Sequence, residues 1–445
     1  MAQIAQIRFV MFKHSLLALL VALALIATSC GSSEPTVLSE PTVLSEPTVL
    51  SEPTVSSEPT VLSEPTVSSE PTVLPEPTVA LAVEIYDAPG DLELVLPLDP
   101  AAIPGSVIDV EELTIDGAVG QRILYHSTSA QGDIVAVSGF VAFPEGDAPD
   151  GGWPLIAWAH GTTGLGDTCA PSNNAENDQL ARALVGFGYA VVATDFEGLG
   201  TPGIHPYIVG ASEAHGVLDS VRAVYELGLP VTDEWIVFGH SQGGHAAMFT
   251  GQLQSTYAPE LKLIGVVAGA PPSQMGDLGD ALIGSDFQGY LIMTAAGLAA
   301  ANPDLDLADV LSADAISLIG VVETGCTEDI FEVYNPLDYD DVTIVDNPFV
   351  LPDWAAAVKL NDTNLLPVTV PLLIIHGGED EQIPVETSAT LLDQLCEFPD
   401  QGPTVRNVYE GQSHAGVLTT FAAVPDLLAW VAGRFAGDIA PSMCS

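Results

Sequence analysis

One serine in this chain stands where a protein can turn an ordinary alcohol into a nucleophile. Ser241 lies within the run Gly239-His240-Ser241-Gln242-Gly243, so a glycine stands two residues before it and two residues after it. Glycines at those positions permit a tight strand-to-helix turn in which the serine backbone is strained and bulkier neighbours would collide. We therefore predict that Ser241 is a nucleophile.

A serine hydroxyl needs a histidine to take its proton, and the histidine needs a carboxylate to orient it and stabilise its charge. Both partners follow Ser241 in the sequence. Asp380 stands in a glycine turn after the apolar run Leu372 to Ile375, and His414 stands in a loop of small residues after the run Val405 to Tyr409. The sequence therefore predicts a catalytic triad of Ser241, Asp380 and His414.

Acyl transfer also requires N–H groups that stabilise the negative oxygen of the tetrahedral intermediate. The backbone amide of Gln242, the residue after the nucleophile, is one predicted donor. The second is expected in the loop Ala159-His160-Gly161-Thr162-Thr163-Gly164. The backbone amide of Thr163 or Thr162 would supply it.

These residues need a scaffold, and the apolar pattern predicts an α/β fold. Alternating runs at 107–115, 121–127 and 134–143 indicate antiparallel strands that open the sheet. Continuous apolar runs separated by helical stretches then indicate a mostly parallel central sheet covered by helices on both faces. The runs lie at 155–159, 190–194, 235–238, 263–268 and 372–375, and the helical stretches include 178–186, 212–227 and 244–257.

The regular alternation breaks between Pro271 and Pro367. Residues 271–367 carry helical patterns, for example at 280–300 and 306–322. A helical stretch that interrupts a parallel sheet after the nucleophile strand is typical of an inserted cap over the site. We therefore expect one domain at 81–445 with a cap insertion at 271–367.

The first 80 residues have a different character. Residues 1–29 carry Arg8, Lys13 and a short apolar stretch, which predicts a signal peptide of the lipoprotein type with acylation of Cys30; cleavage without acylation is the alternative. Residues 30–80 contain Ser-Glu-Pro-Thr-Val-Leu/Ser eight times with small changes. A proline in every unit and little apolar mass predict a disordered, extended spacer.

Composition excludes some partners. The chain has 59 Asp and Glu against 9 Lys and Arg, a formal net charge of −50. A nucleic-acid partner is excluded because phosphate binding needs cationic patches. We interpret the acidity as a solvated surface, with calcium binding as an alternative that no calcium-loop motif supports. No metal-ligand spacing is present, and we predict neither a metal nor a cofactor.

Two further patterns bear on the chemistry. The segment Gly198-Leu199-Gly200-Thr201-Pro202-Gly203 matches a dinucleotide-binding loop, but Pro202 and Pro206 would interrupt the helix that should follow it. Apart from Cys30, four cysteines remain: Cys169, Cys326, Cys396 and Cys444. An even number in an exported protein predicts two disulfides, and the sequence alone leaves three pairings open.

With these residues identified, the region from about Pro97 to the C-terminus resembles the secretory lipase family (Candida lipase A-like) of the α/β-hydrolase superfamily. The resemblance is carried by the loops at 159–164, 169–172 and 195–200, by Gly239 to Gly244, by the Asp380 turn and by His414. It implies an α/β-hydrolase fold with a helical cap and lipase or carboxylesterase activity. It favours Asp380 over the flanking glutamates, and it implies that Cys169 pairs with Cys326 and Cys396 with Cys444.

The sequence therefore predicts a secreted serine carboxylic-ester hydrolase that acts on small-molecule or lipid acyl esters through an acyl-enzyme intermediate. It would be a monomer at the extracellular face of a bacterial cell, attached to the membrane by an N-terminal lipid anchor, or released. A serine peptidase of the same fold and a non-catalytic surface-binding domain are the alternatives. The spacer and the acidity lie outside the family pattern, so the family's substrate preference is not carried over.

Overall fold

A computed structural model describes residues 84–87, 92–420 and 422–444. The chain divides into two compact units, Met1–Pro77 and Thr78–Ser445, and every described residue belongs to the second. The predicted signal peptide, Cys30 and the 30–80 spacer lie outside the described residues. None of the helices in the described part is both long enough and apolar enough to cross a membrane.

Nine strands of the second unit form one sheet in the order β11-β10-β9-β8-β6-β7-β5-β4-β3. The three predicted opening strands pair antiparallel, and the six that run from β7 to β11 in this order pair parallel. Two more strands form a separate antiparallel pair. The strands are β1 (Glu84–Asp87), β2 (Glu93–Leu96), β3 (Val107–Ile115), β4 (Ala118–Thr128), β5 (Ile134–Pro144), β6 (Trp153–Ala159), β7 (Ala190–Thr194), β8 (Val231–His240), β9 (Lys262–Gly269), β10 (Leu372–Gly377) and β11 (Thr404–Tyr409).

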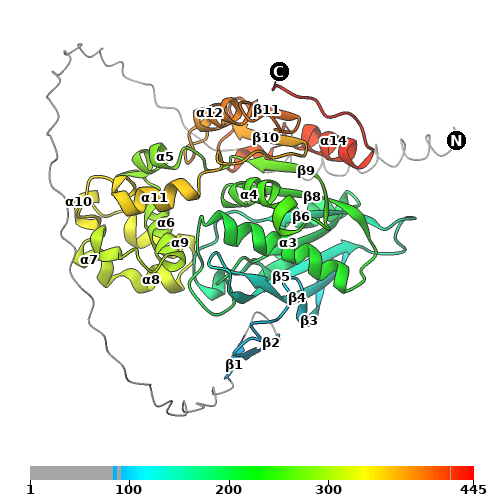
Figure 1. Ribbon diagram of the computed structural model, residues 1–445, viewed down its shortest axis with the longest axis horizontal. Coiled ribbons are helices and arrows are strands. Elements are labelled where there is room, and N and C mark those ends of the chain that lie inside the picture. The colour runs from blue at the N-terminus through cyan, green and yellow to red at the C-terminus, as the bar shows by residue number, and fades with distance from the viewer. Residues whose placement is uncertain (1–83, 88–91, 421, 445) are drawn as a thin grey trace, which may run out of the picture. The chain divides into compact units, whose positions relative to one another are not determined.

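Helices cover both faces of this sheet (Figure 1). The described α-helices are α2 (Gln179–Gly186), α3 (Gly210–Glu226), α4 (Gln242–Tyr257), α5 (Met275–Leu282), α6 (Gln288–Ala301), α7 (Ala313–Ser317), α8 (Ile319–Thr324), α9 (Thr327–Tyr334), α10 (Tyr339–Val342), α11 (Pro352–Leu360), α12 (Val385–Leu395), α13 (Gly416–Thr419) and α14 (Val424–Phe435). Short 3₁₀ helices are η2 (Asp167–Cys169), η3 (Pro171–Asn177), η4 (Leu307–Asp309) and η5 (Pro348–Val350).

The two-residue period of a strand explains why the strands are apolar throughout. On β8, Trp235 and Val237 point into a core shared with α3, α4 and α12, whereas Ile236 and Phe238 point into a core shared with α2 and α14. All four side chains are fully buried. A strand covered on both faces cannot show the polar alternation of a half-exposed strand. The fold-class prediction of a mostly parallel sheet between two helical layers is confirmed.

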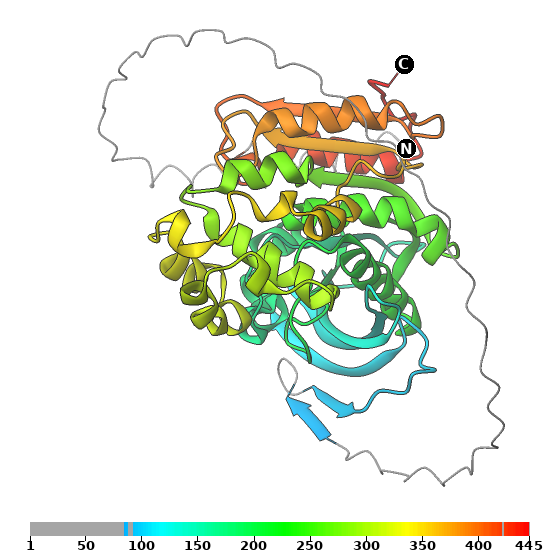
Figure 2. The same cartoon turned by 60° about the vertical axis from the view of Figure 1, so that its left-hand side comes forward.

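The helices α5 to α11 lie between β9 and β10 in the sequence and gather beside the sheet in one group (Figures 1 and 2). They have an apolar core of their own, which includes Leu291, Ile292 and Trp354. We call residues 271–367 the helical insertion. The sequence pattern predicted one helix over 280–300, and this was wrong. The chain turns at Gly284, whose φ of +64° suits glycine, and α6 begins only at Gln288.

Candidate active site

Ser241 occupies the turn between β8 and α4. Its φ of 59° and ψ of −123° lie in a region that residues with a side chain rarely adopt. A side chain on Gly239 would collide with the carbonyl of Gly243, and one on Gly243 would collide with the carbonyl of Ala159. The N–H of Ser241 donates to the carbonyl of Gly269 on β9 at 2.9 Å. The glycines therefore let the strained serine sit against two neighbouring strands, with its side chain beyond the strand end.

Asp380 and His414 are in direct contact. The chain leaves β10 at Gly377 and β11 at Tyr409, so the two loops emerge side by side from adjacent parallel strands. The Nδ1–H of His414 donates to Oδ2 of Asp380 at 2.7 Å. The second carboxylate oxygen of Asp380 accepts the backbone N–H of Gln382 at 3.0 Å and of Ile383 at 2.9 Å. The carboxylate is thus held by its own turn while it orients the imidazole.

The neighbouring glutamate makes a different contact. Oε2 of Glu381 accepts the backbone N–H of His414 at 3.0 Å and therefore holds the histidine loop, not the imidazole. Burial by itself raises the pKa of the Asp380 carboxyl, but hydrogen bonds from His376 and His414 outweigh it and hold that pKa well below its usual range. Asp380 is therefore a permanent anion at neutral pH.

Ser241 lies at the same edge of the sheet as this pair. The ring of His240, the residue before it, has its centroid 4.6 Å from that of His414. Burial lowers the pKa of His240 to about 3, so this neighbour is neutral and adds no charge beside His414. Because His414 uses Nδ1 for Asp380, its Nε2 is the nitrogen left to receive a proton. The three predicted catalytic residues thus come from three strand ends that meet at one edge.

The predicted oxyanion donors lie on two adjoining segments. Gln242 is the first residue of α4, and the N–H groups of a helix N-terminus favour negative charge. The loop after β6 passes close by, because a side chain on Gly161 would lie 3.7 Å from Cβ of Ser241. In that loop the Thr162 hydroxyl contacts the Tyr207 hydroxyl at 2.8 Å, and the Thr163 carbonyl accepts the N–H of Thr327 at 2.9 Å. This loop is therefore fixed from two sides.

A buried polar network lies beneath the start of α4. The side-chain amide of Gln242 donates to Oε1 of Glu213 at 3.0 Å, and the other oxygen of Glu213 lies 2.6 Å from Nδ1 of His245. Nε2 of His245 donates to the carbonyl of Asn361 in the helical insertion at 2.7 Å. Burial lowers the pKa of His245, but the charge of Glu213 and these hydrogen bonds raise it overall. The network ties Gln242 to the insertion.

The described chain contains two disulfides, and one of them lies next to the site. Cys169 is joined to Cys326, and Cys396 is joined to Cys444, the pairing that the family resemblance implies. Cys326 precedes α9 of the helical insertion and forms an isolated bridge with Gly164. The first disulfide therefore fastens the loop that carries Thr162 and Thr163 to the insertion.

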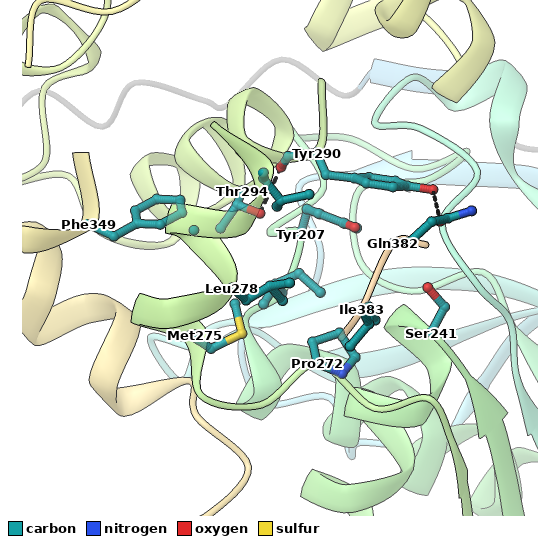
Figure 3. A pocket seen from close by; sticks show the side chains of 13 residues that line it. Tyr207, Ser241, Pro272, Met275, Leu278, Tyr290, Thr294, Phe349, Gln382 and Ile383 are labelled. Atoms are coloured by element: carbon teal, nitrogen blue, oxygen red, sulfur yellow. Dashed lines mark hydrogen bonds between the residues drawn. The ribbon is translucent and has the colours of Figure 1, made fainter. Parts of the chain in front are cut away.

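A largely apolar pocket opens from Ser241 into the helical insertion (Figure 3). At its polar end, the Tyr290 hydroxyl of α6 donates to Oε1 of Gln382 at 3.0 Å, which joins the insertion to the turn of Asp380. Aliphatic and aromatic side chains form most of the wall. The lining residues are Tyr207, Ile208, Ser241, Pro272, Met275, Leu278, Gly279, Leu282, Tyr290, Thr294, Phe349, Gln382 and Ile383.

The remaining sequence patterns have structural roles. The segment 198–203 is not followed directly by a helix, since α3 begins only at Gly210. The dinucleotide interpretation therefore has no support. Asp195 before it is buried and accepts hydrogen bonds from Ser138 and Ser172. Across the described residues, no group of three or more His, Cys, Asp or Glu side chains could hold a metal ion.

The sequence pattern did not indicate a role at the site for His376, His245, Tyr207 or Tyr290. The one available signal for His376 was its place four residues before Asp380, at the end of the strand that leads into the acid turn. The other contacts join positions far apart in the chain, and no local pattern reports them.

Comparison with known proteins adds a family. A family model described as "Secretory lipase" matches residues 172–442. Lipase 10 of Candida albicans is 28% identical over 284 residues, which cover 58% of this chain and 57% of that protein. A secreted triacylglycerol lipase of Malassezia globosa is 26% identical over 328 residues, which cover 65% and 67%. The match thus spans little more than half the length of the Candida albicans relative.

Solved structures agree on the fold. The closed state of Candida antarctica lipase A superposes with a TM-score of 0.67 at 23% identity and covers 77% of this chain and 84% of that one. A rice cell wall degrading esterase, LipA from Xanthomonas oryzae, gives a TM-score of 0.60 at 19% identity and covers 75% and 97%. At these identities the likeness extends to the architecture and no further.

Proposed function

Since the chain belongs to the secretory lipase family, we propose that it is a serine carboxylic-ester hydrolase that acts on acyl esters. The observation that carries the proposal is the 2.7 Å hydrogen bond between Asp380 and His414 at the sheet edge where Ser241 is held in a strained turn. A buried anion, an imidazole and a half-buried hydroxyl in that order are what nucleophilic acyl transfer requires.

In the proposed reaction, Ser241 Oγ attacks the ester carbonyl carbon while His414 Nε2 takes its proton. His414 then returns the proton to the leaving alcohol as the tetrahedral intermediate collapses to an acyl-enzyme. Water activated by His414 attacks that ester, and the acid is released with Ser241 restored. Asp380 remains ionised throughout and stabilises the imidazolium, because its own pKa lies far below that of an imidazole.

The backbone amide of Gln242 and the amide of Thr163, or of Thr162, would hold the negative oxygen of each tetrahedral intermediate. Two observations support this assignment: Gln242 begins a helix, and Gly161 approaches Ser241 closely enough to bring the loop of both threonines alongside. The disulfide from Cys169 to Cys326 would keep that loop in place during the reaction.

We infer the substrate class from the pocket. Apolar side chains of the helical insertion, including Met275, Leu278 and Phe349, line the cavity that starts at Ser241. An apolar wall favours an apolar acyl group over a charged one because it offers no partner for a buried charge. Acyl esters with an apolar acid part are therefore the proposed substrates, and polyesters remain within this class.

We extend the proposal to the export of the protein. The apolar start of the chain, Cys30 and the eight repeats would direct the domain 81–445 outside the cell, acylate it and hold it away from the membrane surface as a monomer. Washing cells with high salt and then with detergent tests the anchor. Release by salt alone would contradict acylation of Cys30.

A fluorophosphonate probe tests the nucleophile. We expect labelling of Ser241 and loss of ester hydrolysis in Ser241→Ala. Ser220→Ala is the control, because Ser220 is a buried serine that donates only to the carbonyl of Val217, on the same helix α3. Ester hydrolysis that survives in Ser241→Ala would overturn the proposal.

A substrate panel tests the class. We expect turnover of p-nitrophenyl esters to persist from short to long acyl chains, and a steep preference for acetate would contradict the apolar-acid assignment. Faster cleavage of peptides than of esters by the same protein would favour a peptidase instead.

A further inference from the structure

We propose that His376 is a positioning residue for the reaction and that it holds the Asp380 carboxylate in place for His414 through a hydrogen-bonded chain that begins at Arg406. The inference rests on the proposed function, since it concerns the same site. It adds His376, Ser388 and Arg406, which lie behind the Asp380 carboxylate, to the proposed triad.

His376 faces the carboxylate from inside the sheet. It lies one residue before the end of β10 and is fully buried. Its Nε2 is 3.0 Å from the carbonyl oxygen of Ile383 and 3.2 Å from Oδ2 of Asp380. Both of these oxygens can only accept, so Nε2 must carry a hydrogen. Its single N–H is therefore directed between the Ile383 carbonyl, which accepts the hydrogen bond, and Oδ2 of Asp380, the same oxygen that accepts from His414.

The other ring nitrogen is fixed from behind. Nδ1 of His376 is 2.8 Å from Oγ of Ser388 on α12, and Nε of Arg406 on β11 donates to the same Oγ at 2.8 Å. A guanidinium has no acceptor, so the Ser388 oxygen accepts from it and must donate its own proton elsewhere. The carbonyl of Val385, 3.0 Å from this hydroxyl, already accepts from Nη2 of Arg406 at 2.7 Å.

The Val385 carbonyl has two lone pairs and can accept from both groups. Because Nε2 of His376 carries a hydrogen, Nδ1 of a neutral ring is an acceptor, and the Ser388 hydroxyl is the donor within its reach. In that arrangement the ring is a neutral imidazole with its only hydrogen on Nε2. In this arrangement the contact with Arg406 leaves the Ser388 hydroxyl free to donate to Nδ1, which supports the tautomer with its N–H on the Asp380 side of the ring. His376, Ser388 and the Asp380 side chain are all fully buried, so water does not compete for these contacts.

The arrangement leaves Asp380 little freedom. Its Oδ1 accepts two backbone N–H groups of its own turn, and its Oδ2 accepts the N–H of His414 and lies 3.2 Å from Nε2 of His376. A carboxylate held on both oxygens cannot rotate away from His414. Sharing Oδ2 with His376 also reduces the negative charge that the oxygen offers to His414.

Other titratable groups surround the pair, and His376 itself contributes to the low pKa of His240. The His240 ring of β8 lies tilted against that of His414, and Tyr290 of α6 binds Gln382 in the acid turn. Glu381 binds the His414 backbone, and Arg406 contacts Ser388. Burial lowers the pKa of His240 to about 3, and burial together with the charges of Asp380 and Glu381 raises that of Tyr290 to about 12. Neither titrates between pH 5 and pH 9.

The test is the pH dependence of kcat/KM for a p-nitrophenyl ester in His376→Phe and His376→Gln. Without the N–H, the less satisfied Asp380 oxygen attracts the His414 imidazolium more strongly, so the acid limb moves to higher pH, by roughly half a pH unit. We expect kcat of the Phe variant to fall roughly tenfold, the equivalent of one charged hydrogen bond, with KM nearly unchanged. The Gln variant, which keeps an N–H donor, should retain the wild-type acid limb.

Controls separate positioning from folding. His215→Phe removes a histidine of α3 that bonds the Thr128 carbonyl far from the site, and its profile should match the wild type. Ser388→Ala keeps His376 but removes the hydroxyl that contacts its Nδ1, so the ring can adopt either tautomer. Its acid limb should move to higher pH, as in His376→Phe, but by a smaller amount. If His376→Phe does not fold, Ser388→Ala decides the question.

Two results would overturn the inference while leaving the proposed function intact. One is an unshifted acid limb in folded His376→Phe or, failing that, in Ser388→Ala, with Ser241 still labelled by the fluorophosphonate. The other is a Gln variant as impaired and as shifted as the Phe variant. Activity that persists in Ser241→Ala would instead remove the proposed function itself.

Discussion

Replacing Asp380 by asparagine should reverse the tautomer of His414. Oδ1 of Asp380 accepts two backbone N–H groups, so the amide oxygen of an asparagine must take that position. The amide NH₂ then occupies the place of Oδ2 and points at Nδ1 of His414, 2.7 Å from it in the native protein. Nδ1 must accept, and the ring hydrogen moves to Nε2. His414 can then no longer take a proton from Ser241.

The magnitude follows from the roles of the two nitrogens. A tautomer error of this kind costs roughly 10³- to 10⁴-fold in kcat, which corresponds to about 4 to 5 kcal/mol of transition-state stabilisation. The effect should be large here because the NH₂ of the asparagine would also face the Nε2–H of His376. That nitrogen lies 3.2 Å from Oδ2 of Asp380 in the native protein, so two donors would point at each other.

The assay is kcat and KM for a p-nitrophenyl ester at neutral pH, with a thermal melt to show that the variant is folded. Glu381→Gln is the matched control, because its amide oxygen can still accept the backbone N–H of His414. We expect the control to stay within a few-fold of the wild type. A folded Asp380→Asn variant that keeps more than a tenth of the wild-type kcat would refute the assignment of Asp380 as the orienting acid.

Three further outcomes are expected. Cys169→Ser, which opens a loop of 157 residues closed by Cys326, should lower the free energy of unfolding by roughly 3 to 5 kcal/mol in urea titrations; an unchanged midpoint would contradict this. Burial lowers the pKa of His205 to about 4 and of His240 to about 3, so the unfolded chain binds more protons below about pH 6.5, the usual histidine pKa. The free energy of unfolding should therefore be complete above that pH and fall as the pH drops towards 4, by up to roughly 3 kcal/mol per histidine, and a flat profile of urea midpoints across this range would count against it. Met275→Trp should fill the apolar pocket and lower kcat/KM for a decanoate ester at least tenfold relative to the butyrate; an equal effect on both esters would argue against an acyl site there.

Much of the fold could be predicted from the sequence because its signals are local. The strands β6 to β10 are apolar on both faces, and a run such as Trp235 to Phe238 is recognisable without knowledge of its neighbours. The turn at Ser241 was recognisable for the same reason, since its glycines are needed by backbone geometry within five residues. These features depend on short-range sterics and burial.

The rest depends on contacts between distant positions. The helical insertion has a core of its own, so its helix boundaries respond to packing as well as to periodicity, and the chain turns at Gly284 inside a stretch that was predicted as one helix. The role of His376 depends on Ser388 and Arg406, which come from α12 and β11. No residue type marks a histidine as the partner of a carboxylate four residues later.

The covalent link between Cys169 and Cys326 has a consequence for when this protein can work. Thiols stay reduced in most cytosols. In a newly made chain, the loop of Thr162 and Thr163 beside Ser241 would therefore lack its disulfide to the helical insertion. Only an oxidising compartment completes it. Under the proposed function, the enzyme would reach its full activity only after it has left the compartment in which it was made. Until then, the lipids of the producing cell would be protected from hydrolysis.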